Sequence, residues 1–447
     1  MMLTILCRLI VRIFFREIVV EGREHLPATG PAIITPNHPN ALLDPLVLQV
    51  LSPPLRLRFV AKAPLFRIPL LGWIMRRMRA IPVVRRLDTD APVDYTPFFT
   101  ACLDTLGAGD SLVIFPEGRS LPQPFMAPLR TGAARLFYLA HERGVDVRIL
   151  PVGLNYERGA MFRTSVLVSV APPLDTAGYL TKHEADPDGG VRTLIAEIGR
   201  ALDQHVFQAE TFRDRELLLL LERLYSEDAS NAAWPQRFAR LKAFERALAR
   251  LRKSCPHEID RLRHLLGRYE RRSVTFGVRE DPWRQRRVRS ATLVLVGLSG
   301  LGVASIGWLL NWLPYKLCAL LVRLTGRHES EAATYKIVYS LFLFPLTYMV
   351  QGIVAARWFG WGAAIAFGAV IVPLSYFTLR FFEWYEERGG WPRMLAAWFG
   401  RTRSRRAPRH LARLRERIVA NVDALAARPE LRVGASESPT SSQNDDR

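Results

Sequence analysis

Short apolar runs alternate with amphipathic stretches through the first half of the chain. Residues 17–22, 32–35, 58–61, 112–115, 147–154 and 166–170 are predicted strands, and residues 42–51, 97–106, 129–143 and 191–208 have the spacing of helices. Strands that alternate with helices predict an α/β domain with a mainly parallel sheet flanked by helices. We assign residues 17–210 to this domain.

Residues 211–290 carry a different pattern. Large apolar residues recur at helical spacing among many arginines and glutamates, as at Phe238, Leu241, Phe244, Leu248 and Leu251. This spacing predicts helices with an apolar stripe and a charged face. We interpret the segment as a basic helical region that follows the α/β domain.

Three later segments are long and uncharged. Residues 291–313, 337–356 and 358–379 contain no Asp, Glu, Lys or Arg over 23, 20 and 22 positions, and each is long enough to cross the hydrocarbon core of a bilayer. We therefore predict transmembrane or re-entrant helices over residues 291–380, which would make this an integral membrane protein.

Basic residues flank the membrane segment on both sides, with Arg284, Arg286 and Arg287 before it and Arg380 and Arg388 after it. The positive-inside rule places both flanks in the cytoplasm, which requires an even number of crossings. Either residues 317–322 help the first segment to return as a re-entrant hairpin, or one of the three segments lies flat. The α/β domain is expected on the cytoplasmic face.

The two ends of the chain differ. Residues 1–16 are apolar but carry Arg8, Arg12 and Arg16 at four-residue spacing, which predicts an amphipathic helix lying on the bilayer surface. A cleaved signal peptide is the alternative, but no small-residue cleavage site follows and two arginines interrupt the apolar stretch. Residues 381–433 are predicted to form a basic cytoplasmic helical tail, and the polar residues 434–447 a disordered one.

Composition narrows the partners. The net charge of +20 implies an anionic partner, either nucleic acid or the anionic surface of a membrane, and the 49% hydrophobic content favours membrane lipids. No aromatic-rich strand or zinc finger accompanies the basic residues, so no nucleic acid is expected. The four cysteines are widely separated, which suggests neither a zinc site nor a disulfide framework.

The first candidate for chemistry follows the predicted strand at residues 32–35. His38 lies directly after this strand, and Asp44 lies six residues further on. The unperturbed pKa of histidine is near neutral pH, and a nearby carboxylate fixes its tautomer and stabilises the imidazolium formed when it takes a proton. These two residues are a candidate general base and its orienting group.

A second polar loop follows the predicted strand at residues 112–115. It consists of Pro116, Glu117, Gly118, Arg119 and Ser120. Ligands of α/β sheets bind at the carboxyl ends of strands, and the guanidinium group suits bidentate recognition of phosphate. Two polar strand-end loops therefore predict one site.

These residues resemble a known family. Residues 37–45, Asn-His-Pro-Asn-Ala-Leu-Leu-Asp-Pro, and residues 115–120 are similar to the first and third motifs of the glycerolipid acyltransferases, which include 1-acylglycerol-3-phosphate and glycerol-3-phosphate acyltransferases. Residues 80–85 resemble the second motif, with its arginine at Arg85, and residues 149–152 resemble the fourth, centred on Pro151. The resemblance covers residues 15–210, and the four motifs occur in the family's order.

The resemblance implies site residues and substrates. His38 and Asp44 would be catalytic, and Arg85, Glu117, Gly118, Arg119 and Pro151 would bind the substrate, with backbone N–H groups near Gly118 facing the developing oxyanion. The acyl donor would be acyl-CoA or acyl carrier protein, and the acceptor a glycerol-phosphate precursor. No metal site and no cofactor are implied. An alternative for Glu117 is that it pairs with Arg85 or Arg119 to fix the loop.

The chain departs from the family pattern at two points. His38 and Asp44 enclose five residues where the family usually has four, and Arg79 stands where a glycine usually opens the second motif. We expect the turn before the helix to absorb the extra residue.

These observations predict a membrane-bound O-acyltransferase of phospholipid biosynthesis that converts lysophosphatidate to phosphatidate. Two alternatives stay open within the sequence. In the first, the acceptor is glycerol 3-phosphate or another lysophospholipid. In the second, the protein is a catalytically silent membrane adaptor that binds lipid, and the longer spacing between His38 and Asp44 reflects the loss of activity.

Overall fold

The computed structural model of the protein describes residues 2–52, 55–67, 69–85, 91–121, 123–157, 159, 161–225, 234–275, 290–325, 329–387 and 406–428. The chain divides into two compact units, the first made of residues 1–212 and 303–379 and the second of residues 213–302 and 380–447. The tail at residues 434–447 and the flanking residues Arg284, Arg286, Arg287 and Arg388 lie outside the described residues.

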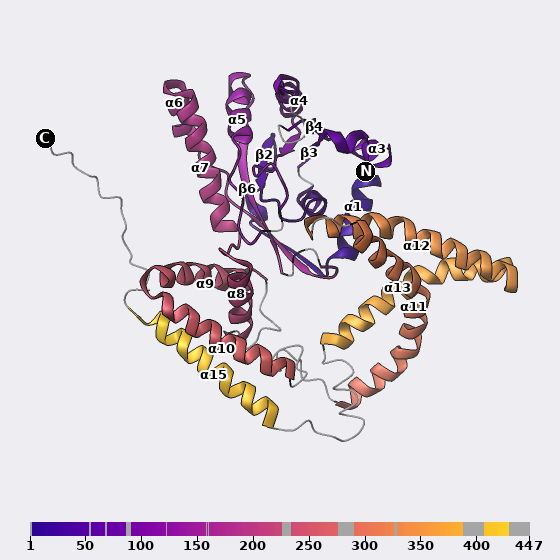
Figure 1. Cartoon of the computed structure of the whole chain (residues 1–447). Helices are drawn as coiled ribbons and strands as arrows, with labels where there is room; N and C mark the ends of the chain where they lie inside the picture. Colours follow the sequence, from indigo (N-terminus) through magenta and orange to yellow (C-terminus); the bar gives the residue numbers. More distant parts are fainter. Residues whose placement is uncertain are drawn as a thin grey trace. The chain divides into compact units, whose positions relative to one another are not determined.

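A seven-stranded sheet organises the α/β part of the first unit (Figure 1). Its strands lie in the order β1-β7-β6-β2-β5-β3-β4, and every neighbouring pair is parallel except β6 and β7. The mainly parallel sheet predicted from the sequence is therefore confirmed. The strands are β1 (Glu17–Glu21), β2 (Ala32–Pro36), β3 (Leu57–Lys62), β4 (Ile81–Val83), β5 (Ser111–Val113), β6 (Arg148–Tyr156) and β7 (Ser165–Val170).

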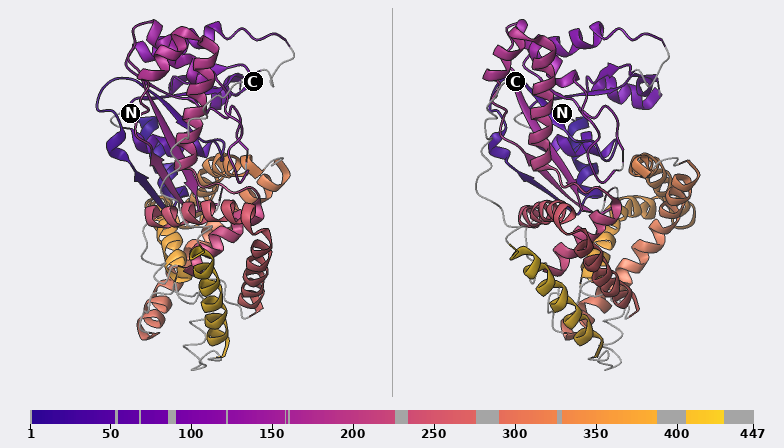
Figure 2. Two further views of the ribbon diagram at one scale, coloured as in Figure 1. Left: turned by 90° about the vertical axis from the view of Figure 1, so that its left-hand side faces the viewer. Right: turned by 60° about the vertical axis from the view of Figure 1, so that its left-hand side comes forward.

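Helices cover both faces of this sheet (Figure 2). Successive strand residues point to opposite sides, so the apolar strands present apolar side chains on both faces, and the helices bury them. In β2, Ala32 and Ile34 pack with α1 (Met2–Phe14) and α2 (Leu43–Leu48). Ile33 between them packs against α4 (Thr96–Gly107), α5 (Gly132–Glu142) and α7 (Pro187–His205) on the other face. The sequence of a strand that is buried on both faces is a continuous apolar run, and this pattern predicted the strand at residues 32–35.

Short elements complete the domain. They are η1 (Arg23–His25), η2 (Gln49–Leu51), η3 (Ala63–Arg67), α3 (Pro69–Arg77) and α6 (Ala177–Ala185). The sequence pattern did not predict β4, α3 or α6, because three to nine residues are too few to establish a period.

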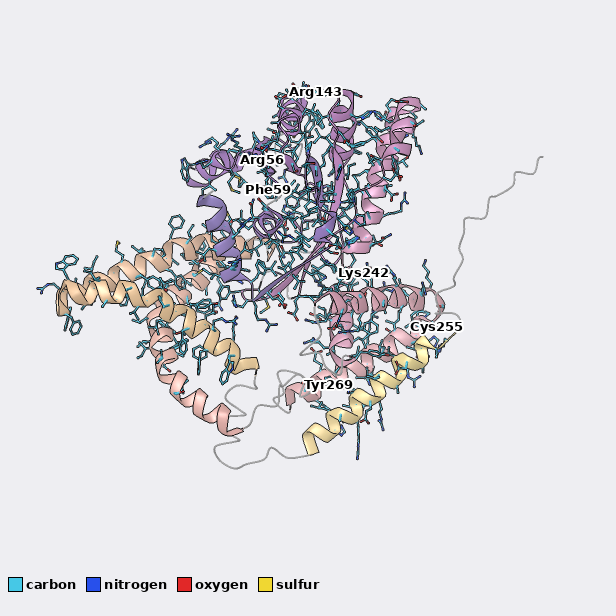
Figure 3. All side chains as sticks on the ribbon, turned by 180° about the vertical axis from the view of Figure 1, so that it is seen from behind. Arg56, Phe59, Arg143, Lys242, Cys255 and Tyr269 are labelled. Atoms are coloured by element: carbon cyan, nitrogen blue, oxygen red, sulfur yellow. The ribbon has the colours of Figure 1, made fainter. Side chains whose placement is uncertain are left out.

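The second unit contains a helical module of α8 (Phe212–Tyr225), α9 (Trp234–Ser254), α10 (Pro256–Thr275) and α15 (Arg406–Ala426). Its core includes Leu224, Leu241, Leu411 and the buried ring of Tyr269, which Figure 3 labels. Although α15 follows the membrane segment, it binds the helices that precede that segment: Arg415 Nε donates to the carbonyl of Leu224 at 2.7 Å, and Tyr225 donates to Asp423 at 2.5 Å.

Three long apolar helices form the membrane segment: α11 (Ser290–Thr325), α12 (Glu329–Phe359) and α13 (Trp361–Glu387). By length and composition each is able to cross a bilayer. Residues 317–322 lie inside α11, which is continuous through Pro314. The predicted re-entrant return at residues 317–322 is therefore wrong, because the apolar spacing simply continues the same helix.

The three membrane helices meet at a polar cluster. Asn311 of α11 donates to Ser375 of α13 at 2.8 Å, and Tyr348 of α12 donates to Asn311 at 2.5 Å. Gly307 of α11 lies against Thr378 of α13, and Asn311, four residues later in α11, binds Ser375, three residues earlier in α13. Hence α11 and α13 run antiparallel at this contact, whereas the first and third of three consecutive membrane crossings would run in the same direction.

Candidate active site

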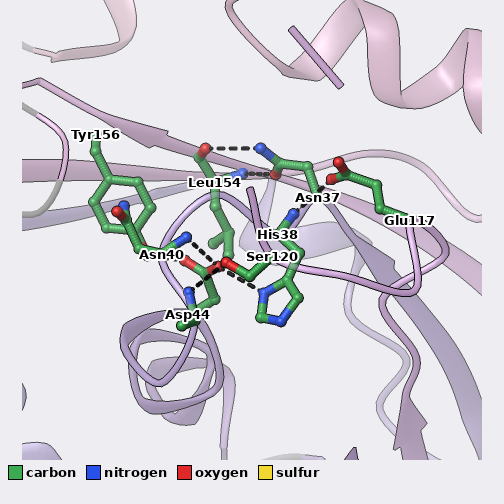
Figure 4. Close-up of polar contacts among 9 residues, drawn as sticks. Asn37, His38, Asn40, Asp44, Glu117, Ser120, Leu154 and Tyr156 are labelled. Atoms are coloured by element: carbon green, nitrogen blue, oxygen red, sulfur yellow. Dashed lines mark hydrogen bonds and ion pairs between the residues drawn. The ribbon is translucent and has the colours of Figure 1, made fainter. Parts of the chain in front are cut away.

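Five parallel strands, β2 to β6, end at one edge of the sheet, and the candidate residues follow these ends. β2 leads into His38, β5 into Glu117 and β4 into Arg85. Figure 4 shows His38, Asp44 and Glu117 together, although Glu117 is 79 residues from His38 in the sequence. The predicted convergence of two strand-end loops on one site is found in the fold.

His38 and Asp44 form a hydrogen-bonded pair, with 2.8 Å between His38 Nδ1 and Asp44 Oδ2. Asp44 is fully buried, whereas the side chain of His38 is 18% exposed. The second ring nitrogen of His38 is thus the one left for a substrate. The ring of Phe115 stacks on the imidazole with the centroids 3.9 Å apart, which holds its plane.

Three groups hold the carboxylate of Asp44. Besides His38, the backbone N–H of Asn40 donates to Oδ2 at 2.8 Å and the hydroxyl of Tyr156 donates to Oδ1 at 2.5 Å (Figure 4). Burial raises the pKa of Tyr156 well above its usual value, so the phenol keeps the proton that it donates. Asp44 is therefore oriented before any substrate binds.

Both departures from the family pattern take up a left-handed backbone. Ala41, within the longer spacing between His38 and Asp44, has φ +41°, and its N–H donates to Ser120 Oγ at 2.8 Å. The extra residue is thus absorbed in the turn before α2, as expected. Arg79 has φ +52°, a conformation that glycine adopts without strain. These two residues carry the local conformational cost of the departures.

Glu117 holds the backbone of the site. Its two oxygens accept the N–H groups of His38 at 2.7 Å and Ala127 at 2.9 Å. Burial raises the pKa of Glu117, and these two hydrogen bonds oppose the shift. The alternative pairing with Arg85 or Arg119 is not what the structure shows, because both oxygens of Glu117 accept backbone N–H groups. The contact of Glu117 with substrate stays a prediction.

Arg85 and the Gly118 loop lie together at the same edge. Arg85 Nη1 donates to the carbonyl of Gly118 at 3.0 Å. Gly118 has φ +69°, and its own N–H donates to the carbonyl of Phe115 at 3.0 Å, so this N–H belongs to the turn and not to an oxyanion site. Gly118 and Arg119 are exposed.

Pro151 lies away from these loops. It is a buried residue inside β6, in register with Thr35 of β2, and its carbonyl accepts the N–H of Ala171 at 3.0 Å. The structure therefore places Pro151 inside the sheet, and its contact with substrate stays a prediction.

Several site residues were not found by sequence reasoning. Tyr156 ends β6, Lys62 ends β3, and the side chain of Asn37 binds Leu154 through both its amide atoms, at 3.2 and 2.6 Å. The available signal was their position, because Lys62 and Tyr156 follow within two residues of the ends of predicted strands. Among the described residues no group of His, Cys, Asp and Glu is arranged to hold a metal ion.

Comparison with known proteins identifies the domain that contains these residues. The acyltransferase family model matches residues 17–155. A chloroplast 1-acyl-sn-glycerol-3-phosphate acyltransferase of Arabidopsis thaliana is 30% identical over 170 residues, covering 36% of this chain and 44% of the relative. Residues 17–155 are an acyltransferase domain of the glycerolipid acyltransferase family.

Further relatives of this acyltransferase domain differ in their acceptors. A Saccharomyces cerevisiae glycerol-3-phosphate O-acyltransferase is 25% identical over 140 residues, covering 30% of this chain and 18% of that protein. The crystal structure of a Thermotoga maritima 1-acyl-sn-glycerophosphate acyltransferase matches 44% of this chain and 79% of that one, with 18% identity and a TM-score of 0.32. The chain spans less than half the length of the Arabidopsis and yeast relatives.

Proposed function

We propose that the protein transfers a fatty acyl group from a thioester donor, acyl-CoA or acyl carrier protein, to a hydroxyl of a glycerol-phosphate lipid precursor. Lysophosphatidate, giving phosphatidate, is the acceptor that we favour. The observation that carries the proposal is the His38–Asp44 pair, which is held at 2.8 Å by buried groups at the carboxyl edge of an acyltransferase domain.

In the proposed mechanism His38 acts as a general base. Its Nε2 takes the proton of the acceptor hydroxyl while Nδ1–H donates to Asp44, whose negative charge stabilises the imidazolium. The acceptor oxygen attacks the thioester carbonyl and forms a tetrahedral intermediate. The C–S bond then breaks, and the thiolate leaves with the proton from His38. This chemistry requires no metal and no redox cofactor.

Cationic side chains at the same edge supply an anchor for the phosphate of the acceptor. Arg85 follows β4, Lys62 ends β3, and Arg119 lies in the loop after β5. Guanidinium groups bind phosphate oxygens in a bidentate manner, so we assign Arg85 and Arg119 to phosphate recognition. Glu117 is assigned to positioning the backbone of His38.

The alternatives concern the acceptor and the class of protein. Glycerol 3-phosphate and other lysophospholipids remain candidate acceptors, since relatives with both kinds of acceptor match the chain. A catalytically silent adaptor is not favoured, because the longer spacing between His38 and Asp44 leaves their hydrogen bond intact.

We place the acyltransferase domain at the cytoplasmic face of the membrane. The packing of α15 on α8 and α10 supports this placement, because it keeps the chain before and after the membrane segment on one side, as an even number of crossings would. The antiparallel contact of α11 with α13 fits the same conclusion. A reporter fused after residue 447 is then expected to signal in the cytoplasm, and a signal from the opposite side contradicts this topology.

The activity is tested with purified full-length protein in detergent micelles and one labelled acyl-CoA. The acceptors are lysophosphatidate, glycerol 3-phosphate and lysophosphatidylcholine, and the measurement is repeated with an acyl carrier protein donor. We expect acylation of lysophosphatidate to be fastest. Acylation of none of the acceptors with either donor contradicts the enzyme proposal, and a faster reaction with another acceptor corrects the substrate.

A further inference from the structure

A groove rich in arginine lies between α1 and the start of the sheet, apart from the His38–Asp44 pair. We define the arginine groove by Arg8 and Arg12 of α1, Arg16 just after the end of that helix and Arg23 of η1, with Glu17 as the one carboxylate of its lining. It has a volume of about 460 Å³ and an apolar floor that includes Phe15 and Val20. The lining is therefore strongly cationic, and the proposed acyl transfer does not use it.

The walls of the arginine groove are fixed to the domain. Arg8 donates to the carbonyl of Ser52. At the C-terminal end of α1, Arg163 Nη1 donates to the carbonyls of Ile13 at 3.0 Å and Phe15 at 2.8 Å, which would otherwise lack helix partners. A helix held near its middle and at its C-terminal end presents its arginines in a more fixed arrangement, so less conformational entropy is lost when an anion binds.

An apolar ridge runs beside the arginines. Leu9 and Ile13 of α1 are 52% and 44% exposed, whereas Val11 and Phe14 face the core. On a helix of 3.6 residues per turn, Leu9 and Ile13 form a stripe about 100° around the helix axis from Arg8 and Arg12. A ridge of this kind enters the boundary between headgroups and acyl chains, which places the neighbouring guanidinium groups at the depth of lipid phosphates.

We propose that the arginine groove is a second, non-catalytic lipid site that binds the phosphate headgroup of an anionic membrane phospholipid. The arginines give the groove an excess of positive charge that is complementary to the single negative charge of a phosphodiester, and guanidinium groups donate hydrogen bonds to phosphate oxygens. The apolar floor suits the glycerol and the first methylenes of the acyl chains. The occupant is a bilayer lipid and not free phosphate, because the exposed ridge of Leu9 and Ile13 adjoins the charged stripe.

The test uses the detergent-solubilised full chain with the substitution His38→Ala, so that turnover does not enter and the result is independent of the proposed acyl transfer. The probes are dihexanoylphosphatidylglycerol, dihexanoylphosphatidylcholine and inorganic phosphate, and their affinities are measured by isothermal titration. We expect Arg12→Gln to weaken binding of the phosphatidylglycerol about tenfold, the loss of one charge-assisted hydrogen bond. Arg12→Lys should retain part of the affinity.

Controls make the result decisive. Arg12 is exposed, so its replacement should leave the fold intact, and Arg23→Gln repeats the test from the opposite wall of the groove. Arg192→Gln on α7, whose side chain is 70% exposed outside the groove, should bind like the His38→Ala parent. Three results overturn the proposal: unchanged binding in Arg12→Gln and Arg23→Gln, equal affinity for phosphatidylcholine, or inorganic phosphate binding as tightly as the lipid.

Discussion

The candidate active site, at the carboxyl edge of the sheet, and the helical module both contain buried carboxylates, but the hydrogen-bond partners of these carboxylates differ. At the active site, Asp44 and Glu117 accept hydrogen bonds from backbone N–H groups, the Tyr156 hydroxyl and His38, and no described lysine or arginine binds them. In the helical module each buried carboxylate has arginine partners. Asp214 binds Arg252 and Arg263, Glu222 binds Arg237 and Arg240, and Glu258 binds Arg428.

This difference in partners indicates which buried carboxylates stabilise the fold and which one is able to assist a reaction. A carboxylate that is already neutralised by two arginines gains little from a further cation, so its removal mainly leaves buried charge unpaired. Asp44 has no permanent cationic partner among the described residues, and it gains most when His38 becomes an imidazolium. Burial by itself therefore does not distinguish the proposed catalytic Asp44 from a supporting carboxylate, and the feature that sets Asp44 apart is its hydrogen bond to a histidine.

The largest expected effect is at the active site. His38→Ala should lower kcat/KM at least about a hundredfold, as expected for the loss of a general base, without changing the thermal unfolding temperature greatly. His141→Ala, which removes an exposed histidine of α5, is the matched control and should keep normal activity. Normal turnover in His38→Ala would show that the partners of Asp44 do not distinguish a catalytic carboxylate from a supporting one.

In the helical module, Asp214→Asn should act on stability and not on chemistry. It leaves Arg252 and Arg263 without their buried partner, at a cost of about 3 kcal/mol, the lower end of the range for a broken buried pair because both arginines are partly exposed. Hydrogen exchange of the amides in α8 and α10 should then be faster by about a hundredfold.

The control for Asp214 is Asp260→Asn, because Asp260 binds the same Arg263 at the surface with its side chain 76% exposed. This change should move exchange little. Loss of kcat in Asp214→Asn at a temperature where the module is folded would contradict a purely supporting role.

Arg85 tests whether the cationic groups of the site recognise phosphate. Arg85→Ala should lower kcat/KM about tenfold to a hundredfold for a phosphate-bearing acceptor, chiefly through KM, because a charge-assisted hydrogen bond is lost. Arg85→Lys should recover only part of this loss. An equal loss with a phosphate-free analogue would instead assign Arg85 to holding the Gly118 carbonyl.

The smallest effect is a difference in pH dependence between two glutamates. Burial raises the pKa of Glu117 above 4.5, so the folded state holds this proton more tightly and the contribution of Glu117 to stability falls as pH rises above about 4.5. The hydrogen bond from Arg428 lowers the pKa of Glu258 below 4.5, so its contribution is present above that pH and is lost as pH falls.

Thermal unfolding between pH 4 and 7 measures this difference. The unfolding temperature of the natural protein relative to Glu117→Gln should decrease as pH rises, and relative to Glu258→Gln it should decrease as pH falls. The same direction of change for both variants would mean that the two carboxylates do not have opposite environments.

The sequence by itself determined the α/β class, most of the strands, the His38 and Asp44 candidates and the three apolar segments. These features depend on local periodicity, on uncharged length and on residues close together in the chain. His38 and Asp44, for example, are six residues apart, and one turn and the start of a helix bring them together.

Only the tertiary structure decided the partners that are distant in sequence. Tyr156 reaches Asp44 across 112 residues and Glu117 reaches the backbone of His38 across 79, because the register of a parallel sheet brings strand ends to one edge. The contact between α15 and α8 likewise joins residues far apart in the sequence, through packing between helices. Local pattern reports which side of an element is buried, but the neighbour on that side is chosen by packing between elements.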